Sequence, residues 1–353
     1  MIRRLAPTLL ISVFFLWLPA LNAATNPAST NQEFAQVLDD YWEAHLELHP
    51  LQATAAGDHR FDHLLPNPLD PAHRRNLKSF YQEYRAKVAK FKSDSLTKEE
   101  RLSKELLTWD CNVQLKQLTF PKHLLPLNQF ESFHLTIGQL AGGSGAHPFK
   151  TTKDYQNWLQ RLNQFYPWCA SAISAMKTGV QKGHTLPKSL TIKVIPQIAD
   201  LAKRPVTEHL FYKPILQLPD SFTEEEKQTL TKQYKEILSQ RIIPAFEALE
   251  DYLKNDYLPH CRDSSGYSAI PDGQAYYRHQ IKIYTTTDMT PDEIFHLGEA
   301  EVRRLSSEME KIKMELNFKG TLKEFFDHVR TAPKLTPFTK PQEVIDNFNL
   351  IHQ

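Results

Sequence analysis

Two histidines near the start of the chain, His45 and His49 in the segment HLELH, are the first residues whose spacing suggests chemistry. Histidines four residues apart lie on one face of a helix and can chelate a metal ion such as zinc. In the motif H-E-x-x-H the glutamate directly follows the first histidine and faces the metal-bound water. Glu47 comes two residues after His45, about 200° around a helix, and therefore faces away. Because no third ligand accompanies them, the pattern favours two surface histidines on a first helix.

Two other segments are similar to catalytic motifs but depart from them at one position. The segment HLGEA, from His296 to Ala300, is similar to the inverted zinc motif H-x-x-E-H, but Ala300 replaces the second histidine. The segment GSGAH contains Ser144, but Ala146 replaces the last glycine of a serine-hydrolase elbow, and no strand is expected before it. A metal-independent hydrolase would use Ser144 as nucleophile and His147 as base. The ordinary interpretation, a helix start and a loop, is favoured for both segments.

The residues kept as candidate substrate-binding positions are Tyr276, Tyr277 and His279. They lie in the run YYRHQIKIY, whose alternation places Tyr277, His279, Ile281 and Ile283 on one face and predicts a β-strand over residues 277–284. A strand at the rim of a helical cleft can pair with an extended peptide, and tyrosine hydroxyls beside it can orient a substrate. In the alternative, Tyr277 packs in the core and Tyr276 lies on the surface, because most aromatic residues in strands are packing residues.

The rest of the pattern predicts helices. Capping residues followed by apolar residues at helical spacing mark helix starts at or near Asn31, Asp70, Thr97, Thr152, Thr223, Thr290, Thr321 and Pro341. Gly179 is the expected C-cap of the helix from Thr152, and Pro244 is expected to kink or split the helix from Thr223. Short helices and proline-marked turns are expected over residues 187–220. The predicted fold is all-α, a multi-helix body with one short β-strand or hairpin element.

Composition limits the classes of function. The 353 residues include 42 Lys and Arg against 41 Asp and Glu. The chain therefore lacks the overall excess of basic residues that would indicate nucleic acid or an anionic membrane surface as a partner. The hydrophobic content of 41% is typical of a globular protein. Cys111, Cys169 and Cys261 are odd in number and form no C-x-x-C pattern, so buried thiols are favoured over a cysteine zinc site. An exported protein could still oxidise two of them.

The first residues predict export. Arg3 and Arg4 precede an apolar run from Leu9 to Leu18 that is shorter than a membrane span, and the small residue Ala23 fits a cleavage site. We therefore expect a signal peptide over residues 1–23, a periplasmic or secreted mature protein, and no membrane contact after cleavage. An uncleaved N-terminal anchor is the alternative.

Several segments together resemble a known family. They are PDGQAYYRHQI, YTTTDMTPDEIFHLG, EAEVRRLSSEM, YWEAHLELHPLQATAAGDHRFD, PFKTTKDYQNWLQRL and IIPAFEALEDYLKNDYLP. In their amino-acid sequence and in their order along the chain, these segments are similar to the bacterial family of unknown function 885 (DUF885), over nearly all of the chain after residue 30. The resemblance implies a secreted or lipoprotein-type, mostly helical protein related to zinc metallopeptidases of the gluzincin type.

The resemblance also implies that part of the family's chemistry is missing. The family's zinc motif and downstream glutamate lie in the second half of a full-length member, and this sequence stops at Gln353 before them. The expectation is a single helical domain over residues 24–353, truncated, with no catalytic residue or metal ligand of its own, and inactive alone. Zinc is expected only in a full-length relative. The implied partners are a complementary C-terminal half and, for the full-length family, a peptide-like substrate.

The alternative is a stand-alone exported helical binding or interaction protein. The two interpretations differ in what they predict for the last helices. A short complete protein closes its core, whereas a truncated one leaves apolar side chains at least partly uncovered. The side chains expected to be uncovered are Leu305, Met309, Phe325, Val344, Ile345 and Phe348.

Overall fold

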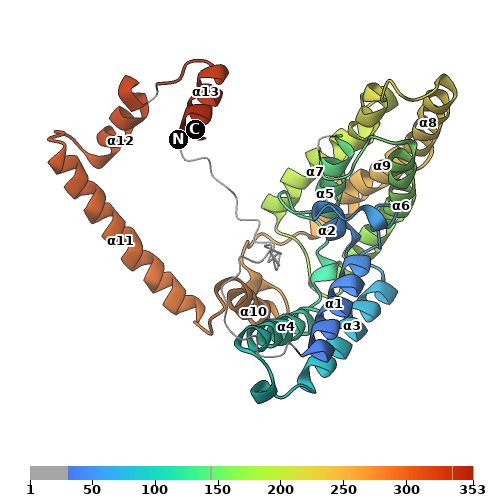
Figure 1. Ribbon diagram of the computed structural model, residues 1–353. Coiled ribbons are helices and arrows are strands. Elements are labelled where there is room, and N and C mark those ends of the chain that lie inside the picture. Colours follow the sequence, from blue (N-terminus) through green and yellow to red (C-terminus); the bar gives the residue numbers. More distant parts are fainter. Residues whose placement is uncertain (1–30, 144, 336, 353) are drawn as a thin grey trace. The chain divides into compact units, whose positions relative to one another are not determined.

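The computed structural model describes residues 31–143, 145–335 and 337–352. The signal peptide expected over residues 1–23 and the possible nucleophile Ser144 lie outside these ranges. Within them the chain forms thirteen α-helices and no sheet, which confirms the all-α prediction (Figure 1). Two compact units divide the chain, unit 1 ending at Ile283 and unit 2 beginning at Tyr284. That residues 24–353 form a single domain stays a prediction.

The β-strand expected over residues 277–284 is wrong, because these residues belong to helix α10 (Gly273–Thr285). Gly273, Tyr276 and His279 are buried at intervals of three, which is helical spacing, while Tyr277 between them is exposed. The spacing of the isoleucines and tyrosines in this run is compatible with the period of a β-strand and with that of an α-helix. Packing of the buried face against α4 selects the helix. A helix offers no free strand edge, so edge addition of a peptide is excluded here.

The first four helices of unit 1 enclose a small aromatic core. They are α1 (Gln32–Leu48), α2 (Pro50–Ala55), α3 (Pro71–Ala89) and α4 (Lys98–Gln117), and α3 packs against both α1 and α4. The predicted caps are present: Asn31, Asp70 and Thr97 each accept a hydrogen bond from a backbone N–H of the first turn. The core consists of Phe34, Phe80, Tyr81, Tyr84, Val88, Leu96, Leu107 and Cys111.

A larger core lies among the next five helices. These are α5 (Phe133–Ala141), α6 (Thr152–Gln181), α7 (Lys188–Lys203), α8 (Glu224–Ile237) and α9 (Ile243–Asp251). Helix α7 packs along α9, and α6 contacts α8 and α9, as Figure 1 shows. The fully buried side chains of this core include Trp158, Leu162, Phe165, Trp168, Phe211, Tyr234, Phe246 and Leu249.

Two local predictions for this region need correction. In the first half of residues 187–220 a single helix, α7, replaces the expected short helices and accommodates Pro196 in its interior, whereas the second half forms the short helices η4 (Val206–Glu208) and η5 (Leu210–Gln217) as predicted. Helix α6 continues beyond Gly179 to Gln181, and Gly183, with a φ of +74°, supplies the left-handed residue after its end. The helix from Thr223 is divided near Pro244, as predicted: a wide π-helical turn, η6 (Leu238–Ile242), separates α8 from α9, in which Pro244 is the second residue. A second such turn, η7 (Tyr252–Tyr257), follows α9.

The remaining connections carry short 3₁₀ helices, each of three residues except η5, which has eight. Their bounds are η1 (His59–Phe61), η2 (Ser93–Ser95), η3 (Lys122–Leu124), η4 (Val206–Glu208), η5 (Leu210–Gln217), η8 (Leu258–His260), η9 (Tyr267–Ala269) and η10 (Pro333–Leu335).

Unit 2 consists of α11 (Pro291–Glu315), α12 (Leu322–Thr331) and α13 (Pro341–His352). Both predicted capping boxes, at Thr290 and Thr321, are formed. Neither α11 nor α13 buries a residue, so no other part of unit 2 covers Leu305, Met309, Val344, Ile345 and Phe348. The prediction that Phe325 is uncovered is wrong. Its side chain is buried, with its ring centroid 5.4 Å from that of Phe318. In the described part of the chain, no helix is both long and apolar enough to cross a membrane.

Candidate functional site

A cleft of about 160 Å³ lies in unit 1, between three segments that are distant in sequence. The segments are the end of α4 with η3, the connection from α6 to α7, and the stretch from Arg262 to the start of α10. A cavity of similar volume, about 150 Å³, holds a molecule the size of benzene. The apolar lining includes Phe120, Leu125, Leu127, Leu186, Leu190 and Ile270, and the polar lining includes Lys122, Asn128, His184, Arg262, Tyr267, Asp272 and Tyr276.

Backbone hydrogen bonds join two of these segments directly. The N–H of Arg262 donates to the carbonyl of Leu186 (3.1 Å), and the N–H of Lys188 donates to the carbonyl of Arg262 (2.8 Å). The hydroxyl of Tyr257 accepts from the N–H of Leu186 at 2.9 Å. The cleft wall is therefore held at fixed positions, as a ligand site requires.

Two glycines allow the chain to approach itself closely around the cleft. A Cβ at Gly273 would lie 1.6 Å from the carbonyl oxygen of Tyr267, and one at Gly179 would lie 2.6 Å from that of His184. No side chain fits at either distance. These close contacts set the spacing between the start of α10 and η9 and between α6 and the segment that carries His184.

Two polar atoms of the lining residues lack a hydrogen-bond partner within the described residues. His184 is buried, and its Nδ1 lies 3.2 Å from the carbonyl of Lys182, which can only accept. Nδ1 must therefore carry the proton, so that Nε2 of the neutral ring is an acceptor, and it is buried without a partner. The Nε of Arg262, an N–H donor, is also buried without a partner. The cleft thus offers one acceptor and one donor.

Aromatic side chains form one side of the cleft. The rings of Tyr267 and Tyr276 are 4.9 Å apart, and that of Phe120 lies 5.3 Å from Tyr276. Burial, followed by the neighbouring Tyr276, raises the pKa of Tyr267. Tyr267 therefore stays protonated and able to donate a hydrogen bond at neutral pH.

The three predicted substrate-binding residues are not brought together. Tyr276 lines the cleft and is buried, whereas Tyr277 is 47% exposed and faces away from it. His279 is buried behind Phe120, with the ring centroids 5.4 Å apart, and does not line the cleft. The structure thus reverses the alternative in which Tyr277 packs and Tyr276 is exposed. A substrate-binding role for any of the three stays a prediction.

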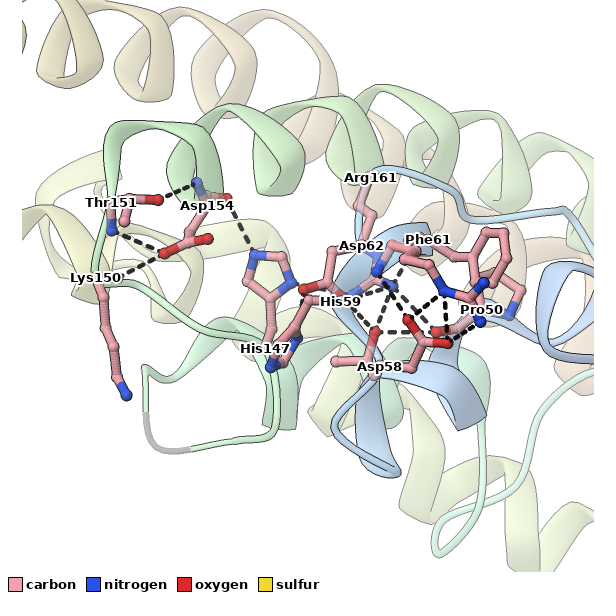
Figure 2. A network of polar contacts seen from close by, with 12 residues as sticks. Pro50, Asp58, His59, Phe61, Asp62, His147, Lys150, Thr151, Asp154 and Arg161 are labelled. Atoms are coloured by element: carbon pink, nitrogen blue, oxygen red, sulfur yellow. Dashed lines mark hydrogen bonds and ion pairs between the residues drawn. The ribbon is translucent and has the colours of Figure 1, made fainter. Parts of the chain in front are cut away.

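A second polar cluster surrounds Arg161, whose side chain on α6 is completely buried (Figure 2). Its guanidinium donates to the hydroxyl of Thr54 (2.7 Å), to the carbonyl of Leu64 (3.2 Å) and, less closely, to two further carbonyls. Asp62, 1% exposed, lies 3.5 Å from the guanidinium and accepts from the Thr54 hydroxyl and from His59 (2.8 Å). The cluster fastens α2 and the loop after it onto α6.

His147 completes this cluster and is not available as a catalytic base. Because a guanidinium can only donate, Nδ1 of His147 must accept from Arg161 at 3.0 Å, and Nε2 then donates to the carbonyl of Asp154 at 3.1 Å. Burial, followed by the charge of Arg161, lowers the pKa of His147 well below its usual range. Both ring nitrogens are engaged, so the proposed pairing with Ser144 has no support from the described residues.

The histidines considered as zinc ligands do not form a metal site. The rings of His45 and His49 lie in contact, tilted by 40° with their centroids 4.4 Å apart, but Nε2 of His45 bonds to Gln52 and Nε2 of His49 to the hydroxyl of Tyr81. Burial lowers the pKa of both rings. Over the described ranges, no three His, Cys, Asp or Glu side chains are grouped to hold a metal ion. The residues present therefore do not fit the zinc that the family resemblance implies.

Sequence reasoning missed most of the cleft. Lys122, His184 and Arg262 lie in loops without a recognisable motif, and a buried arginine such as Arg161 cannot be told from a surface one by its neighbours in sequence. The one usable signal was Asp272-Gly273, which marks a turn next to Tyr276.

Comparisons with solved structures place this fold among larger proteins. The "putative lipoprotein" from Colwellia psychrerythraea has 20% sequence identity and a TM-score of 0.73, over 86% of this chain and 54% of the other. A "putative lipoprotein of unknown function" from Shewanella oneidensis has 19% identity and a TM-score of 0.54, over 85% of this chain and 50% of the other. The chain therefore spans about half the length of the solved structures it matches. At these identities the likeness shows the fold alone.

Sequence comparison supplies the family. No curated protein matches the chain. The model of a bacterial protein family of unknown function, DUF885, matches residues 50–352, which is most of the sequence. The chain belongs to the DUF885 family.

Proposed function

We propose that this chain is the ligand-binding helical part of an exported protein that acts on peptide-like molecules, and that the cleft beside Tyr276 holds one amide unit and one apolar side chain of the ligand. The supporting observation is the unpartnered pair at the cleft, the acceptor Nε2 of His184 and the donor Nε of Arg262. A peptide group presents one N–H and one C=O, which is the complementary set. The apolar lining has room for a side chain beside it.

Export is supported by the two similar solved structures, each of them a "putative lipoprotein". Peptide-bond hydrolysis, which the family resemblance implies, would require a metal site that these residues do not supply. We therefore assign to this chain the binding of the ligand and to a complementary part of the longer protein any zinc and the hydrolytic step.

Calorimetric titration with a tripeptide of alanine, leucine and phenylalanine tests the cleft. His184→Leu removes the free acceptor and should weaken binding about tenfold, the value of one hydrogen bond in a buried site. His279→Leu is the matched control. The side chain of His279 is about as buried as that of His184 but does not line the cleft. Equal affinities for both variants, with melting curves that show folded protein, would exclude the site.

Tyr276 and Tyr277 provide a second matched pair on one helix. Tyr276→Phe removes a hydroxyl from the cleft lining, whereas Tyr277→Phe removes one from the exposed face. If the aromatic wall orients the peptide, only the first substitution should change its affinity. A change confined to Tyr277→Phe would move the binding surface to the opposite face of α10.

We also propose that the complementary part of the longer protein covers the uncovered faces of α11 and α13. The support is the half-length match to the solved relatives together with the five large apolar side chains that unit 2 leaves exposed. Burying one such side chain contributes about 1.5–3 kcal/mol, so five of them form a substantial interface.

Dye binding and sedimentation test this partner. The chain alone should bind an apolar dye, and co-expression with the complementary part, where downstream DNA encodes one, should remove that binding and raise the melting temperature. A homodimer that protects α11 and α13 in hydrogen exchange would identify a second copy as the partner instead. A monomer without dye binding would show that unit 1 covers these faces and would support the stand-alone binding protein.

A further inference from the structure

A groove of about 290 Å³ lies on the other side of η3 from the cleft and is lined almost entirely by cations and apolar residues. Arg74, Arg75 and Lys78 come from the first turns of α3, and His123 comes from η3. Leu69, Pro71 and Leu118 complete the lining. No acidic residue lines it, although the whole chain carries nearly equal numbers of acidic and basic residues.

The cations of this groove are not neutralised by the rest of the described chain. Arg75 and Lys78 take part in no ion pair among the residues that the structure describes, and both are exposed. Arg74 is held in place by a hydrogen bond from Nη2 to the carbonyl of Leu118 (3.1 Å), which leaves its charge uncompensated. The nearest acid along the chain, Asp70, accepts from the N–H of Ala72 as the cap of α3.

The pKa of His123 is affected by its burial and by the cations around it. Its pKa is lowered to about 4, first by burial and then by Arg74, Lys182 and His184, all of them cationic or neutral groups. Its Nδ1 is buried and has no partner within the described part of the chain.

We propose that this groove binds a phosphate group, carried either by a free phosphate compound or by the headgroup of an anionic lipid. Three positive charges match a phosphate group better than a single carboxylate, and arginine binds phosphate oxygens through paired N–H donors. The unpartnered Nδ1 of His123 can supply a further contact. The groove is larger than one phosphate needs, and Leu69 and Leu118 contact the adjoining carbon atoms of the ligand.

Titration with inorganic phosphate, followed through the imidazole resonances of the unmodified protein, is the first test. A bound anion next to His123 must raise the pKa of its ring, because an opposite charge favours the protonated form. We expect a saturable upward shift that added salt weakens. A ring pKa that does not move at saturating phosphate would overturn the proposal.

Charge reversal provides the second test and does not depend on the first. Arg75→Glu with Lys78→Glu changes two exposed side chains and should reduce phosphate binding at least about tenfold. Lys193→Glu with Lys213→Glu makes the same change in net charge at exposed positions outside the groove and should leave binding unchanged. Equal losses in both double variants would reduce the effect to net charge and refute the site.

Vesicles distinguish the two sources of phosphate. If the ligand is a lipid headgroup, vesicles that contain phosphatidylglycerol should bind the protein, those of phosphatidylcholine alone should not, and the Arg75 and Lys78 variant should lose the binding. If only inorganic phosphate binds, the ligand is a soluble phosphate compound. Failure of both phosphate and phosphatidylglycerol to bind would exclude the groove as an anion site.

Discussion

Units 1 and 2 of this chain are both helical and both well capped, yet they differ in what their side chains contact. Unit 1 buries an arginine, an aspartate and two extensive apolar cores. In unit 2 the charges lie in exposed pairs such as Arg304 with Glu301 and Glu308, and α11 buries no side chain at all. Capping residues favour a helix locally, whereas most of the free energy of unfolding comes from tertiary packing of the helix.

The largest contrast is expected for the two arginines. Arg161→Leu leaves Asp62 buried without its cation, and breaking a buried pair in this way costs about 3–5 kcal/mol of unfolding free energy. Arg304→Leu removes only exposed pairs, with exposures near 50% on both sides, and should lower the free energy of unfolding far less than Arg161→Leu does. Urea unfolding of both variants measures the difference, and similar values would refute the role of the buried cluster.

Truncation of an apolar side chain should likewise cost far more stability in unit 1 than in unit 2. Phe246→Ala removes a fully buried ring from the larger core and should cost about 3–5 kcal/mol. Phe348→Ala changes a side chain that is 67% exposed and should alter the stability of the chain alone by less than about 0.5 kcal/mol. If the complementary part does cover α13, Phe348→Ala should become costly once that part is present, as thermal unfolding of the complex would reveal.

His147 is one of several histidines, with His49 and His134, whose pKa burial lowers and on which the dependence of stability on pH should rest. Its folded-state pKa lies below the usual 6.5, so the unfolded chain binds more protons below that pH, and stability is lost as the pH falls through this range. The loss should be about 1 kcal/mol between pH 6.5 and 5.5. His147→Gln keeps an acceptor for Arg161 and a donor for Asp154 but cannot be protonated, so its unfolding curves should depend less on pH. An unchanged slope would contradict the assigned tautomer.

Removal of a cap should produce the least contrast between the two units. Thr97→Ala in unit 1 and Thr290→Ala in unit 2 each delete the hydroxyl of a complete capping box. Each should destabilise its helix by about 1 kcal/mol, because the lost bond is local. Hydrogen exchange in the first turns of α4 and α11 measures both. A much larger effect at Thr97 would show that the tertiary contacts of unit 1 depend on this cap.

Signals that act within one turn of helix were readable from the sequence. The boxes at Thr97, Thr223, Thr290 and Thr321 were predicted and are present, because an N-cap and the residue three positions later suffice to form one. The strand expected at Tyr277 was wrong because both periods fit this short run, and contacts with α4, far away in sequence, select the helix.

The site depends on contacts that sequence spacing does not encode. The free atoms of His184 and Arg262 meet at one cleft although 78 residues separate them, and Arg161 contacts Asp62 across 99 residues. Which polar groups remain without partners depends on how loops close over one another. For the same reason the sequence indicated Tyr276 as a candidate but gave no reason to consider His184.

The wide turns η6 and η7 on either side of α9 have a consequence for insertions and deletions. Each residue of an α-helix rotates the chain by about 100°, so one residue added within a regular helix turns the following side chains away from their partners. A π-helical turn absorbs one added residue locally. Phe246 and Leu249 between the two turns, and Tyr257 at the end of the second, all remain buried. The orientation of Tyr257 is thus set by the number of residues in these turns, and deleting one residue from η7 would turn its hydroxyl away from the N–H of Leu186 that it accepts from.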